Sequence, residues 1–562
     1  MDRIVQSYME GFLKSQQIGE KDQSRQFEMF ASYSAIAQQY AELFDLNDVL
    51  TGAGGDCGID GIALIVNGTL VTAKEEIDDL IELNNGLSEM LFIFIQAKTT
   101  SGFASSEIGT FGAGVVDFFS ETPQFVRNEF IQEKSDLVNY IFDKAIYFRG
   151  KPNCLLYYMT TGKWVDDQNC VARKNMIVHD LEELGLFDDV HFVPVDASLI
   201  QKYYRNTIDV IEKEIDFSQK VLLPEIPKIK QSYLGYVDYQ EYLKLIVGEN
   251  GEIIKNVFYD NVRDYQGEND VNTEIAETIK KSSEKFILLN NGVTIICKKL
   301  TNFRNKFTLT DYQIVNGCQT SHVLYYNKKY LNDNLQIPVK LIETSDEETV
   351  NSIIKATNRQ TEVTSEQLIA LNEFHRKLEE YYKTFTGTKK LYYERRSKQY
   401  NYMTEVEKVR IVSISTQIKA VAAMFFDKPN LASRYYGRLL KAVDGIFSEE
   451  HKQLPYYTCT YLLYKIEYLF RNKILKPEYR KFRYHILMMI KYDFGEEKVP
   501  ELNSNKMEKL CEKILECAYD NVKFHDEVEK MINIIDKYII SPNDTEPTKS
   551  VNFVENLKRE FE

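Results

Sequence analysis

The sequence predicts an α/β region over residues 1–215, a second α/β region over 216–364 and a mainly α-helical region over 365–562. Short β-branched runs alternate with amphipathic stretches in the first two regions, and Pro224 and Pro227 mark the boundary between them. From about residue 365 the apolar spacing is mainly helical. A chain of 562 residues with 44% hydrophobic content is large enough for more than one ordinary core.

Composition argues against several classes of protein. No apolar run approaches the roughly 18 residues of a membrane helix, and Met1-Asp2-Arg3 does not begin a secretion signal. The eight cysteines form no CxxC pair and the seven histidines are dispersed, which disfavours a zinc site, a disulfide framework or a Ser/His/Asp triad. We therefore expect a cytoplasmic protein without a membrane partner. The net charge of −15 disfavours unspecific coating of nucleic acid, but a local basic groove would still permit binding.

The first region is expected to begin with an amphipathic helix over residues 24–43, with Ser24 as its N-cap. Apolar residues keep near-helical spacing along it: Phe27, Phe30, Ala31, Ile36, Ala37, Tyr40 and Leu43. A glycine-rich turn then delivers Asp60 onto the apolar run 62–66, and a second run, 92–95, ends in Gln96-Ala97-Lys98. The polar residues 72–90 between these runs are expected to form a solvated helix or loop.

Asp60, Gln96 and Lys98 are the candidate catalytic residues. Residues two apart on a strand point to the same face, so Gln96 and Lys98 project together, opposite Ala97. If the two runs pair, Asp60 and Gln96 can hold Mg²⁺ or Mn²⁺ with Lys98 beside the ion. The metal would acidify a water and draw charge from a phosphoryl oxygen, while the lysine would stabilise the developing negative charge. The alternative is a plain hairpin with an exposed Asp60 and a lysine at the end of a strand.

The Gly58-Ile59-Asp60-Gly61 turn and the Gln-x-Lys at 96–98 resemble the PD-(D/E)xK nucleases, in the branch whose third motif reads QxK, as in restriction enzymes that cut modified DNA. The resemblance implies a restriction-endonuclease-like fold and assigns metal binding to Asp60 rather than Asp56. It also implies an extra carboxylate from a preceding helix, for which Glu28 is the best-placed residue, although an exposed helix glutamate explains Glu28 equally well. Gln96 replaces the usual acidic residue, so either metal affinity is weaker or another carboxylate compensates.

The remaining elements of this region are expected to complete an α/β sheet whose active edge lies at 60–98. Helical character is expected at 105–120, 126–147 and 172–185, and apolar strands at 154–159 and 190–195.

Side-chain amides mark the second region. Its four motifs are Asn261-Val262-Arg263-Asp264-Tyr265-Gln266-Gly267, Asn290-Asn291-Gly292-Val293-Thr294-Ile295, Ile314-Val315-Asn316-Gly317-Cys318-Gln319-Thr320-Ser321 and Ala356-Thr357-Asn358-Arg359-Gln360-Thr361. Asn and Gly tolerate positive φ, so turns alone explain Asn291-Gly292. The surplus of amides offers the donors and acceptors that a base edge or a ribose requires. The candidate nucleotide- or nucleic-acid-binding residues are Arg263, Asn291, Asn316, Gln319, Thr320, Asn358 and Gln360.

These four motifs, in this order, resemble the abortive-infection phage-resistance (AIPR) family of bacterial proteins over residues 234–400. The resemblance implies a role in phage defence. The turn Asn316-Gly317-x-Gln319 is also similar to the Asp-Gly-Gln-His-Arg turn of ParB-like DNA-modification proteins, with Asn316 in place of the acid and Thr320-Ser321 in place of His-Arg. This second similarity points to contact with a nucleotide or DNA.

Two basic stretches follow. In residues 389–400 basic residues interleave with tyrosines, which suits phosphate contact with base stacking through Arg395 and Arg396. A Tyr-Glu-Arg-Arg run, here at 393–396, also recurs in the AIPR family. The alternative is a helix end with a solvated basic face and buried tyrosines. A second cluster is expected to be exposed surface: Arg471, Lys473, Lys476, Arg480, Lys481 and Arg483.

The sequence therefore predicts a metal-dependent nuclease, with the AIPR-like and helical parts recognising the target or gating cleavage. The choice between DNA and RNA as substrate stays open, with DNA favoured. Two alternatives stay open: a nucleotide or nucleic-acid sensor with a degenerate nuclease fold, and a defence subunit that needs a partner subunit. Cleavage of both strands of a duplex would favour a homodimer.

Overall fold

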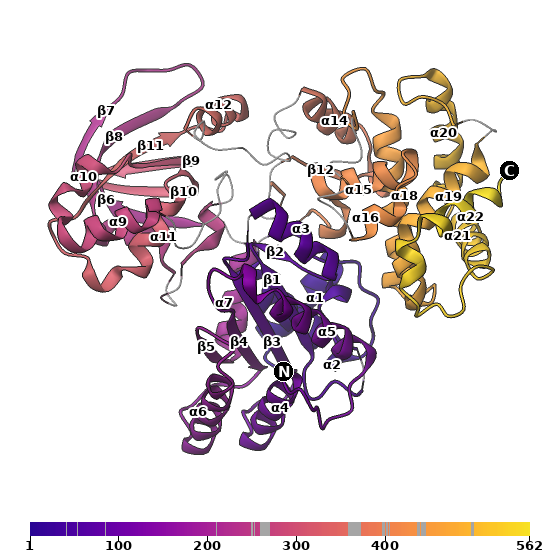
Figure 1. Cartoon of the computed structure of the whole chain (residues 1–562). Coiled ribbons are helices and arrows are strands. Elements are labelled where there is room, and N and C mark those ends of the chain that lie inside the picture. The colour runs from indigo at the N-terminus through magenta and orange to yellow at the C-terminus, as the bar shows by residue number, and fades with distance from the viewer. Residues whose placement is uncertain are drawn as a thin grey trace. The chain divides into compact units, whose positions relative to one another are not determined.

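The computed structural model describes the chain except for residues 41, 53, 85, 209–210, 249–250, 252, 259–269, 358–372, 396–398, 401–402, 404, 435–438, 440–444 and 496–498. It divides into two compact units (Figure 1). The first consists of Met1–Ile36, Leu43–Tyr204 and Asn372–Glu562, and the second of Ala37–Glu42 and Arg205–Leu371. The predicted N-terminal and helical regions therefore belong to one unit.

A five-stranded sheet organises the N-terminal part of the first unit. Its strands are β1 (Gly61–Val66), β2 (Thr69–Leu70), β3 (Met90–Lys98), β4 (Asn153–Thr160) and β5 (Val190–Val195), in the order β2-β1-β3-β4-β5. β1 runs antiparallel to β2 and β3, whereas β3, β4 and β5 are parallel. The register pairs Gly61 with Ile95, so the two apolar runs pair as the sequence predicts and Asp60 is brought to Gln96.

Helices surround this sheet. They are α1 (Arg3–Ser15), α2 (Gln23–Gln39), α3 (Lys74–Asn84), α4 (Ser105–Phe118), α5 (Glu129–Asp143), α6 (Gln168–Glu183) and α7 (Ala197–Ile208). Apolar residues from α4, α5 and α6 share one core with Ile62, Leu64, Phe92 and Phe94 of the sheet. The prediction of Ser24 as the N-cap of the second helix is wrong, because α2 already begins at Gln23.

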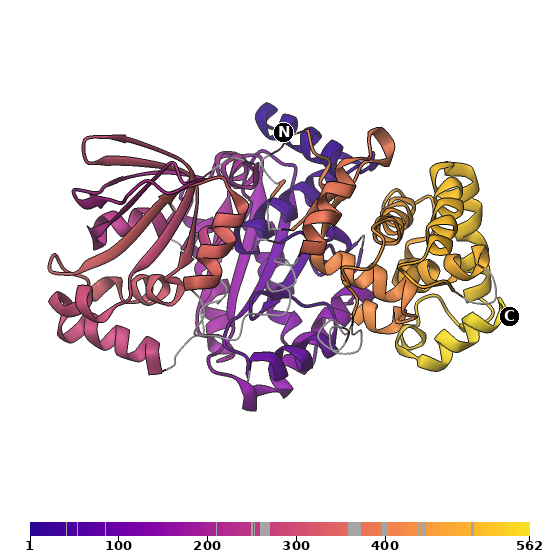
Figure 2. The same cartoon turned by 90° about the horizontal axis from the view of Figure 1, so that it is seen from above.

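The second unit is built on a six-stranded sheet, of which Figure 2 gives a second view. Its strands are β6 (Glu212–Asp216), β7 (Gln219–Leu222), β8 (Gln231–Asp238), β9 (Val293–Phe303), β10 (Lys306–Asn316) and β11 (Gln336–Glu343), in the order β6-β10-β9-β11-β8-β7. Only the pair β9–β11 is parallel among these strands. The predicted boundary at residue 215 falls inside β6, which pairs with β10, and the main segment of the second unit begins earlier, at Arg205.

Helices pack against both faces of this second sheet. Residues of α8 (Tyr239–Ile246), α9 (Asp270–Lys281), α10 (Phe286–Leu289) and α11 (Cys318–Tyr326) contribute to its main core. Val350 of α12 (Glu347–Thr357) packs with Ile296, Val315 and Ile342, which alternate with the residues of the main core along their strands. The unit is therefore mixed α/β, as expected.

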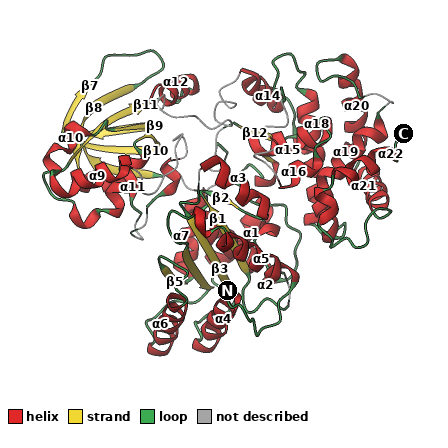
Figure 3. Ribbon diagram, in the orientation of Figure 1, coloured by secondary structure: helices red, strands yellow, loops and turns green. Residues whose placement is uncertain are grey.

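The C-terminal part of the first unit is mainly helical, as Figure 3 shows in red. Its helices are α14 (Glu373–Lys383), α15 (Ile414–Phe425), α16 (Pro429–Arg434), α18 (Leu454–Arg471), α19 (Arg483–Phe494), α20 (Asn505–Tyr519), α21 (Asn521–Ile535) and α22 (Val551–Arg559). Short strands β12 (Tyr392–Glu394) and β13 (Ile411–Ser413) pair in parallel. Among the described residues, no helix is both long enough and apolar enough to cross a bilayer.

Candidate functional site

The glycine-rich turn fixes Asp60 at the start of β1. Cys57 and Gly58 adopt positive φ angles of 55° and 74°, and the Gly58 amide donates to the Asp56 carboxylate at 2.8 Å. The Asp60 amide donates to the carbonyl oxygen of Ile95 at 2.7 Å, which ties the end of the turn to β3. Positive φ at Gly58 needs no strain, so the turn can close tightly before the sheet begins.

The Asp60 carboxylate is buried and bonded to β3. Asp60 is only 5% exposed. Its Oδ2 accepts hydrogen bonds from Gln96 Nε2 at 2.8 Å and from the Ala97 amide at 2.7 Å. Burial raises the pKa of Asp60, although the Ala97 amide and the Lys98 ammonium act to lower it. The alternative of an exposed Asp60 is therefore wrong, and Asp56 does not take its place in this pair.

Glu28 and Lys98 lie within electrostatic reach of Asp60. The Glu28 side chain is 21% exposed and accepts a hydrogen bond from Arg25 Nη1 at 2.7 Å. Burial and the Asp60 carboxylate raise the pKa of Glu28, whereas Arg25 and Lys98 lower it. Of the four residues that the sequence singled out for metal and phosphate chemistry, Asp60 and Gln96 are thus in contact, and the charges of Glu28 and Lys98 act on Asp60. Glu28 is only partly exposed.

A glycine explains why α2 comes so close to the sheet. A Cβ atom at Gly61 would lie 3.0 Å from Ser32 Oγ of α2. Ser32 follows Glu28 by one helical turn and shares its face of the helix. The close contact at Gly61 therefore brings the face of α2 that carries Glu28 to the start of β1, in agreement with the electrostatic effect of Asp60 on Glu28.

Two further residues lie at this site that the sequence patterns did not reveal. Tyr158 of β4 pairs in register with Gln96, and its hydroxyl donates to Glu107 Oε2 of α4 at 2.9 Å. Burial, the Glu107 carboxylate and, more weakly, the Asp60 carboxylate raise the pKa of Tyr158. Glu107 could have been found from its place in the first turn of the helix that follows Gln-x-Lys. No local spacing connects Tyr158 with that glutamate.

This set of donors fits a hard divalent cation. The Asp60 carboxylate lies beside the Gln96 amide and interacts electrostatically with a second carboxylate, Glu28. Oxygen ligands of this kind are those that Mg²⁺ and Mn²⁺ prefer. A cation there would offset the repulsion through which Asp60 raises the pKa of Glu28. Gln96 presents Nε2 to Asp60, so ligation through Oε1 requires the amide to be turned over, which exchanges its nitrogen and oxygen positions.

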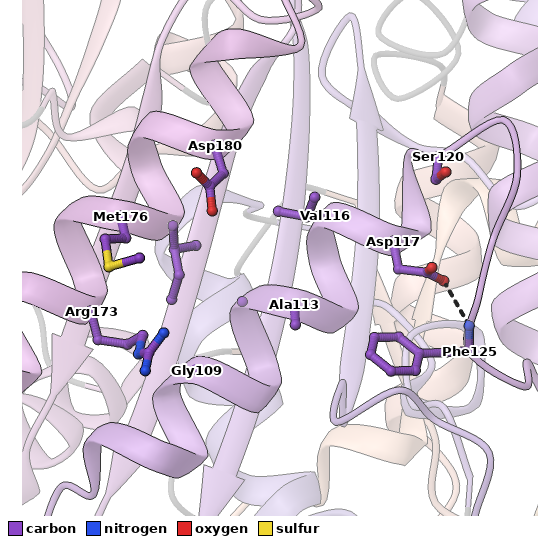
Figure 4. A pocket seen from close by; sticks show the side chains of 11 residues that line it. Gly109, Ala113, Val116, Asp117, Ser120, Phe125, Arg173, Met176 and Asp180 are labelled. Carbon is purple, nitrogen blue, oxygen red and sulfur yellow. Dashed lines mark hydrogen bonds between the residues drawn. The ribbon is translucent and has the colours of Figure 1, made fainter.

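Two other features are separate from these residues. The α4–α6 groove, a pocket of about 380 Å³ shown in Figure 4, is lined by Gly109, Arg173, Met176 and Asp180 among others and includes none of the four candidates. His525, Asp526 and Glu529 bring three possible ligand atoms within 4.8 Å of one another on α21. That group lies on the surface of a single helix, where acidic residues are common without a metal.

Two of the candidates in the second unit, Thr320 and Gln319, are hydrogen-bonded to asparagines outside the candidate set. Asn290 Nδ2 donates to Thr320 Oγ1 at 3.1 Å, and Asn272 Nδ2 donates to Gln319 Oε1 at 2.9 Å. Asn316 is the last residue of β10, and the next residue, Gly317, has a φ of 108° and directly precedes α11. Asn291 is followed by Gly292, which has a φ of 81°. The predicted candidates Arg263, Asn358 and Gln360 lie outside the described residues, as does Arg396.

The tyrosine-rich basic stretch is partly buried: Lys389 is exposed, whereas Tyr393 and Arg395 are buried. Arg395 is 9% exposed and its Nε donates to Glu379 Oε2 at 2.6 Å, while Tyr393 is fully buried. Residues 392–394 form β12 rather than a helix end, so the expected solvated basic face is wrong for Arg395. In the second basic cluster Lys473 and Lys476 are exposed as predicted, but the side chains of Arg480 and Arg483 are only 14% and 20% exposed.

A family model described as AIPR protein matches residues 258–543, slightly more than half of the chain. The chain belongs to the AIPR family, and this membership indicates a role in abortive-infection phage defence. The match begins after residue 234 and continues well beyond residue 400, so it includes most of the helical region and leaves the Asp60 site outside it. Neither curated proteins nor solved structures give a match to the chain.

Proposed function

We propose that the N-terminal part of this AIPR-family protein is a Mg²⁺- or Mn²⁺-dependent nuclease that cleaves DNA phosphodiesters in abortive infection. One observation carries the proposal: Asp60 and Gln96 are hydrogen-bonded across β1 and β3, and the charges of Glu28 and Lys98 act on that pair. This arrangement supports a D…QxK site that is supplemented by a carboxylate from a preceding helix.

Each residue has a distinct role in the proposed reaction. Asp60 and Glu28 would hold the cation, with Gln96 completing its ligands, and the bound cation would acidify a water and draw charge from the phosphate. Lys98 stabilises the negative charge that develops on the phosphoryl oxygens as the water attacks. Because Asp60 and Gln96 are almost fully buried, these charges act in a medium that screens them weakly.

The second unit and the helical part are proposed to recognise the nucleic acid or to gate cleavage. The net charge of −15 supports gating, because the acidic protein as a whole repels the phosphate backbone. Cleavage of both strands would require a homodimer or two successive binding events, and a partner subunit of the defence system could provide the trigger.

A cleavage assay tests the proposal. Plasmid, linear duplex and single-stranded DNA and RNA are incubated with the full chain in Mg²⁺ or Mn²⁺, alongside Lys98→Ala and Asp60→Asn. We expect cleavage of DNA and a loss of about 10²–10³-fold in each variant, as for removal of one charge-stabilising group. Lys151→Ala is the matched control, since this exposed lysine precedes β4 and lies at the opposite end of the parallel strands from Lys98.

The outcomes separate the proposals. Equal cleavage by the parent chain and both site variants would show that Asp60 and Lys98 are not catalytic. Nucleotide or nucleic-acid binding without cleavage in any metal would favour the sensor with a degenerate nuclease fold. Inactivity of the isolated chain together with defence in cells would favour the partner-dependent subunit.

A further inference from the structure

Arg480 links the helical part of the first unit to a segment near the candidate site. It lies on η8 (Pro477–Phe482), and its guanidinium donates to Asp45 Oδ2 at 2.5 Å, to Asp48 Oδ1 at 3.3 Å and to Glu467 Oε2 at 2.8 Å. Because the Arg480 side chain is only 14% exposed, solvent screens these contacts weakly. The contact with Glu467 of α18 orients the guanidinium, and the two contacts with Asp45 and Asp48 fix the acidic segment.

The electrostatics of Asp45 agree with a strong contact. Burial alone would raise the pKa of Asp45, but Arg480 and the Asn47 amide hold it below its usual value. The Asp45 side chain also accepts from that Asn47 amide at 2.8 Å and so caps η1 (Leu46–Asp48). The ion pair and the cap together fix the start of the segment.

The other end of the same segment is bonded to the residues on both sides of the Asp60 side chain. Val49 accepts a hydrogen bond from the Ile62 amide at 2.7 Å, and the Thr51 amide donates to the carbonyl oxygen of Asp60 at 3.1 Å. Thr51 Oγ1 also donates to the carbonyl oxygen of Ile59 at 2.6 Å. Val49 and Thr51 are buried, so a shift of this segment must move the backbone that carries Asp60.

We propose that Arg480 is a positioning residue for the Asp60 site: through Asp45, Asp48 and Thr51 it holds the backbone of the metal-binding turn. Arg480 lies within the AIPR match, and Asp60 lies outside it. The helical part of the family region is thereby a structural component of the proposed catalytic site. The consequence for cleavage rests on the proposed nuclease function, whereas the coupling between Arg480 and the turn does not.

Other ion pairs join the same two parts of the unit without reaching this segment. Lys549 lies 3.2 Å from Glu75 of α3, and Lys473 lies 2.9 Å from Glu20, which precedes α2. Variants of these pairs show whether any weakening of the interface loosens residues 49–62, or whether only loss of the contact of Arg480 with Asp45 and Asp48 does so.

Amide hydrogen exchange of the full chain tests the coupling directly. In Arg480→Ala we expect the amides of residues 49–62 to exchange about tenfold faster or more, because the charged hydrogen bonds that anchor the segment are lost. The amides of β4 are expected to keep their exchange rates, and Lys549→Ala is expected to leave residues 49–62 unchanged. If Arg480→Ala does not fold, Asp48→Asn removes one of the three contacts and Arg480→Lys retains only the charge, and both should give a smaller acceleration in the same segment.

Cleavage kinetics supply the second readout. If the parent chain cleaves DNA, Arg480→Ala should lower kcat by up to about 10²-fold, as expected for a displaced catalytic group, with KM changed by less than about threefold. Faster exchange at 49–62 in a chain that never cleaves DNA would support the positioning role and count against the nuclease. Unchanged exchange at 49–62 in both Arg480→Ala and Asp48→Asn would overturn the positioning role, whatever the activity.

Discussion

At the scale of single residues, the site combines two acids that are costly to ionise. The pKa values of Asp60 and Glu28 are both raised, Asp60 by burial and Glu28 by burial and by the Asp60 carboxylate. The folded protein therefore binds protons at these groups more tightly than the unfolded chain does. Without a cation, stability falls as the pH rises from the unfolded values, 3.8 for Asp60 and 4.5 for Glu28, through the raised folded values.

This linkage predicts a pH-dependent effect of metal on stability. Mn²⁺ should raise the melting temperature more at about pH 8, where both acids are more fully ionised, than at about pH 5, because protons compete for the same oxygens. At 100 times its Kd the ion should add about 2.7 kcal/mol. Asp60→Asn should abolish this gain and leave the metal-free protein equally or more stable at neutral pH, since it removes a buried charge.

Thermal melts of the parent chain and variants with and without Mn²⁺ provide the measurement. Asp136→Asn, an exposed acid on α5, is the matched control and should retain the full gain. A metal-induced shift that persists in Asp60→Asn, or that is larger at the lower pH, would place the ion elsewhere.

The contact between Tyr158 and Glu107 yields a second prediction at this scale. Removing the hydroxyl in Tyr158→Phe should destabilise the fold by about 1–2 kcal/mol, because Glu107 loses a charged hydrogen bond but can regain water at the edge of the site. Glu107→Gln should cost less, and the double variant should cost less than the sum of the two. Urea unfolding of all four proteins gives this coupling energy, and strictly additive losses would show that the pair does not interact.

At the scale of elements, α4 is shaped to lie on the glycine-rich turn. A Cβ atom at Gly114 would lie 1.9 Å from the carbonyl oxygen of Cys57, and one at Gly58 would lie 3.5 Å from Thr110 of the same helix. Glu107, Thr110 and Gly114 recur at helical spacing, so one face of α4 contacts the turn and carries Glu107 to the site.

Gly114→Ala should therefore separate α4 from the turn. Backbone atoms cannot yield to the added methyl group, so we expect a loss of about 1–3 kcal/mol, or more, and loss of the metal-induced stabilisation. Gly11→Ala in α1 is the control: no atom lies within 4 Å of its added Cβ, and a helical alanine should stabilise by about 0.5–1 kcal/mol. Urea unfolding checks both, and equal behaviour of the two variants would contradict the close contact at Gly114.

The elements of the N-terminal part were largely accessible from sequence because their signals are local. Two apolar runs, a glycine-rich turn and a Gln-x-Lys predict the pairing of β1 with β3, and the structure has it with Asp60 opposite Gln96. The contact of Tyr158 with Glu107 was inaccessible, since the two residues lie 51 positions apart and neither follows a recognisable spacing. The burial of Arg395 was also inaccessible, because its partner, Glu379, lies on a different element, α14.

At the scale of the whole molecule, sequence patterns separate the N-terminal region from the helical C-terminal region, whereas the structure joins them in one unit. The contact of Arg480 with Asp45 spans 435 positions, and no periodicity or composition could indicate it. A basic cluster is predicted to be exposed surface unless its acidic partners are known. Here two partners of Arg480, Asp45 and Asp48, lie in the N-terminal part. The region outside the AIPR match and part of the region inside it consequently form one compact unit.

This organisation predicts that the N-terminal part is incomplete alone. A fragment of residues 1–208 should be aggregation-prone or less stable by itself, because it loses the partners of Asp45, Asp48 and Glu75 and exposes the surface that the helical part covers. Co-expressed with residues 373–562, it should form a soluble complex that weakens in salt, since buried and half-buried ion pairs contribute to the contact. Co-purification followed by melts of the complex and the separate fragments measures this. A stable, monomeric 1–208 fragment that does not bind residues 373–562 would show that the two parts are independent domains. That result would remove the structural basis for a link between the AIPR region and the Asp60 site.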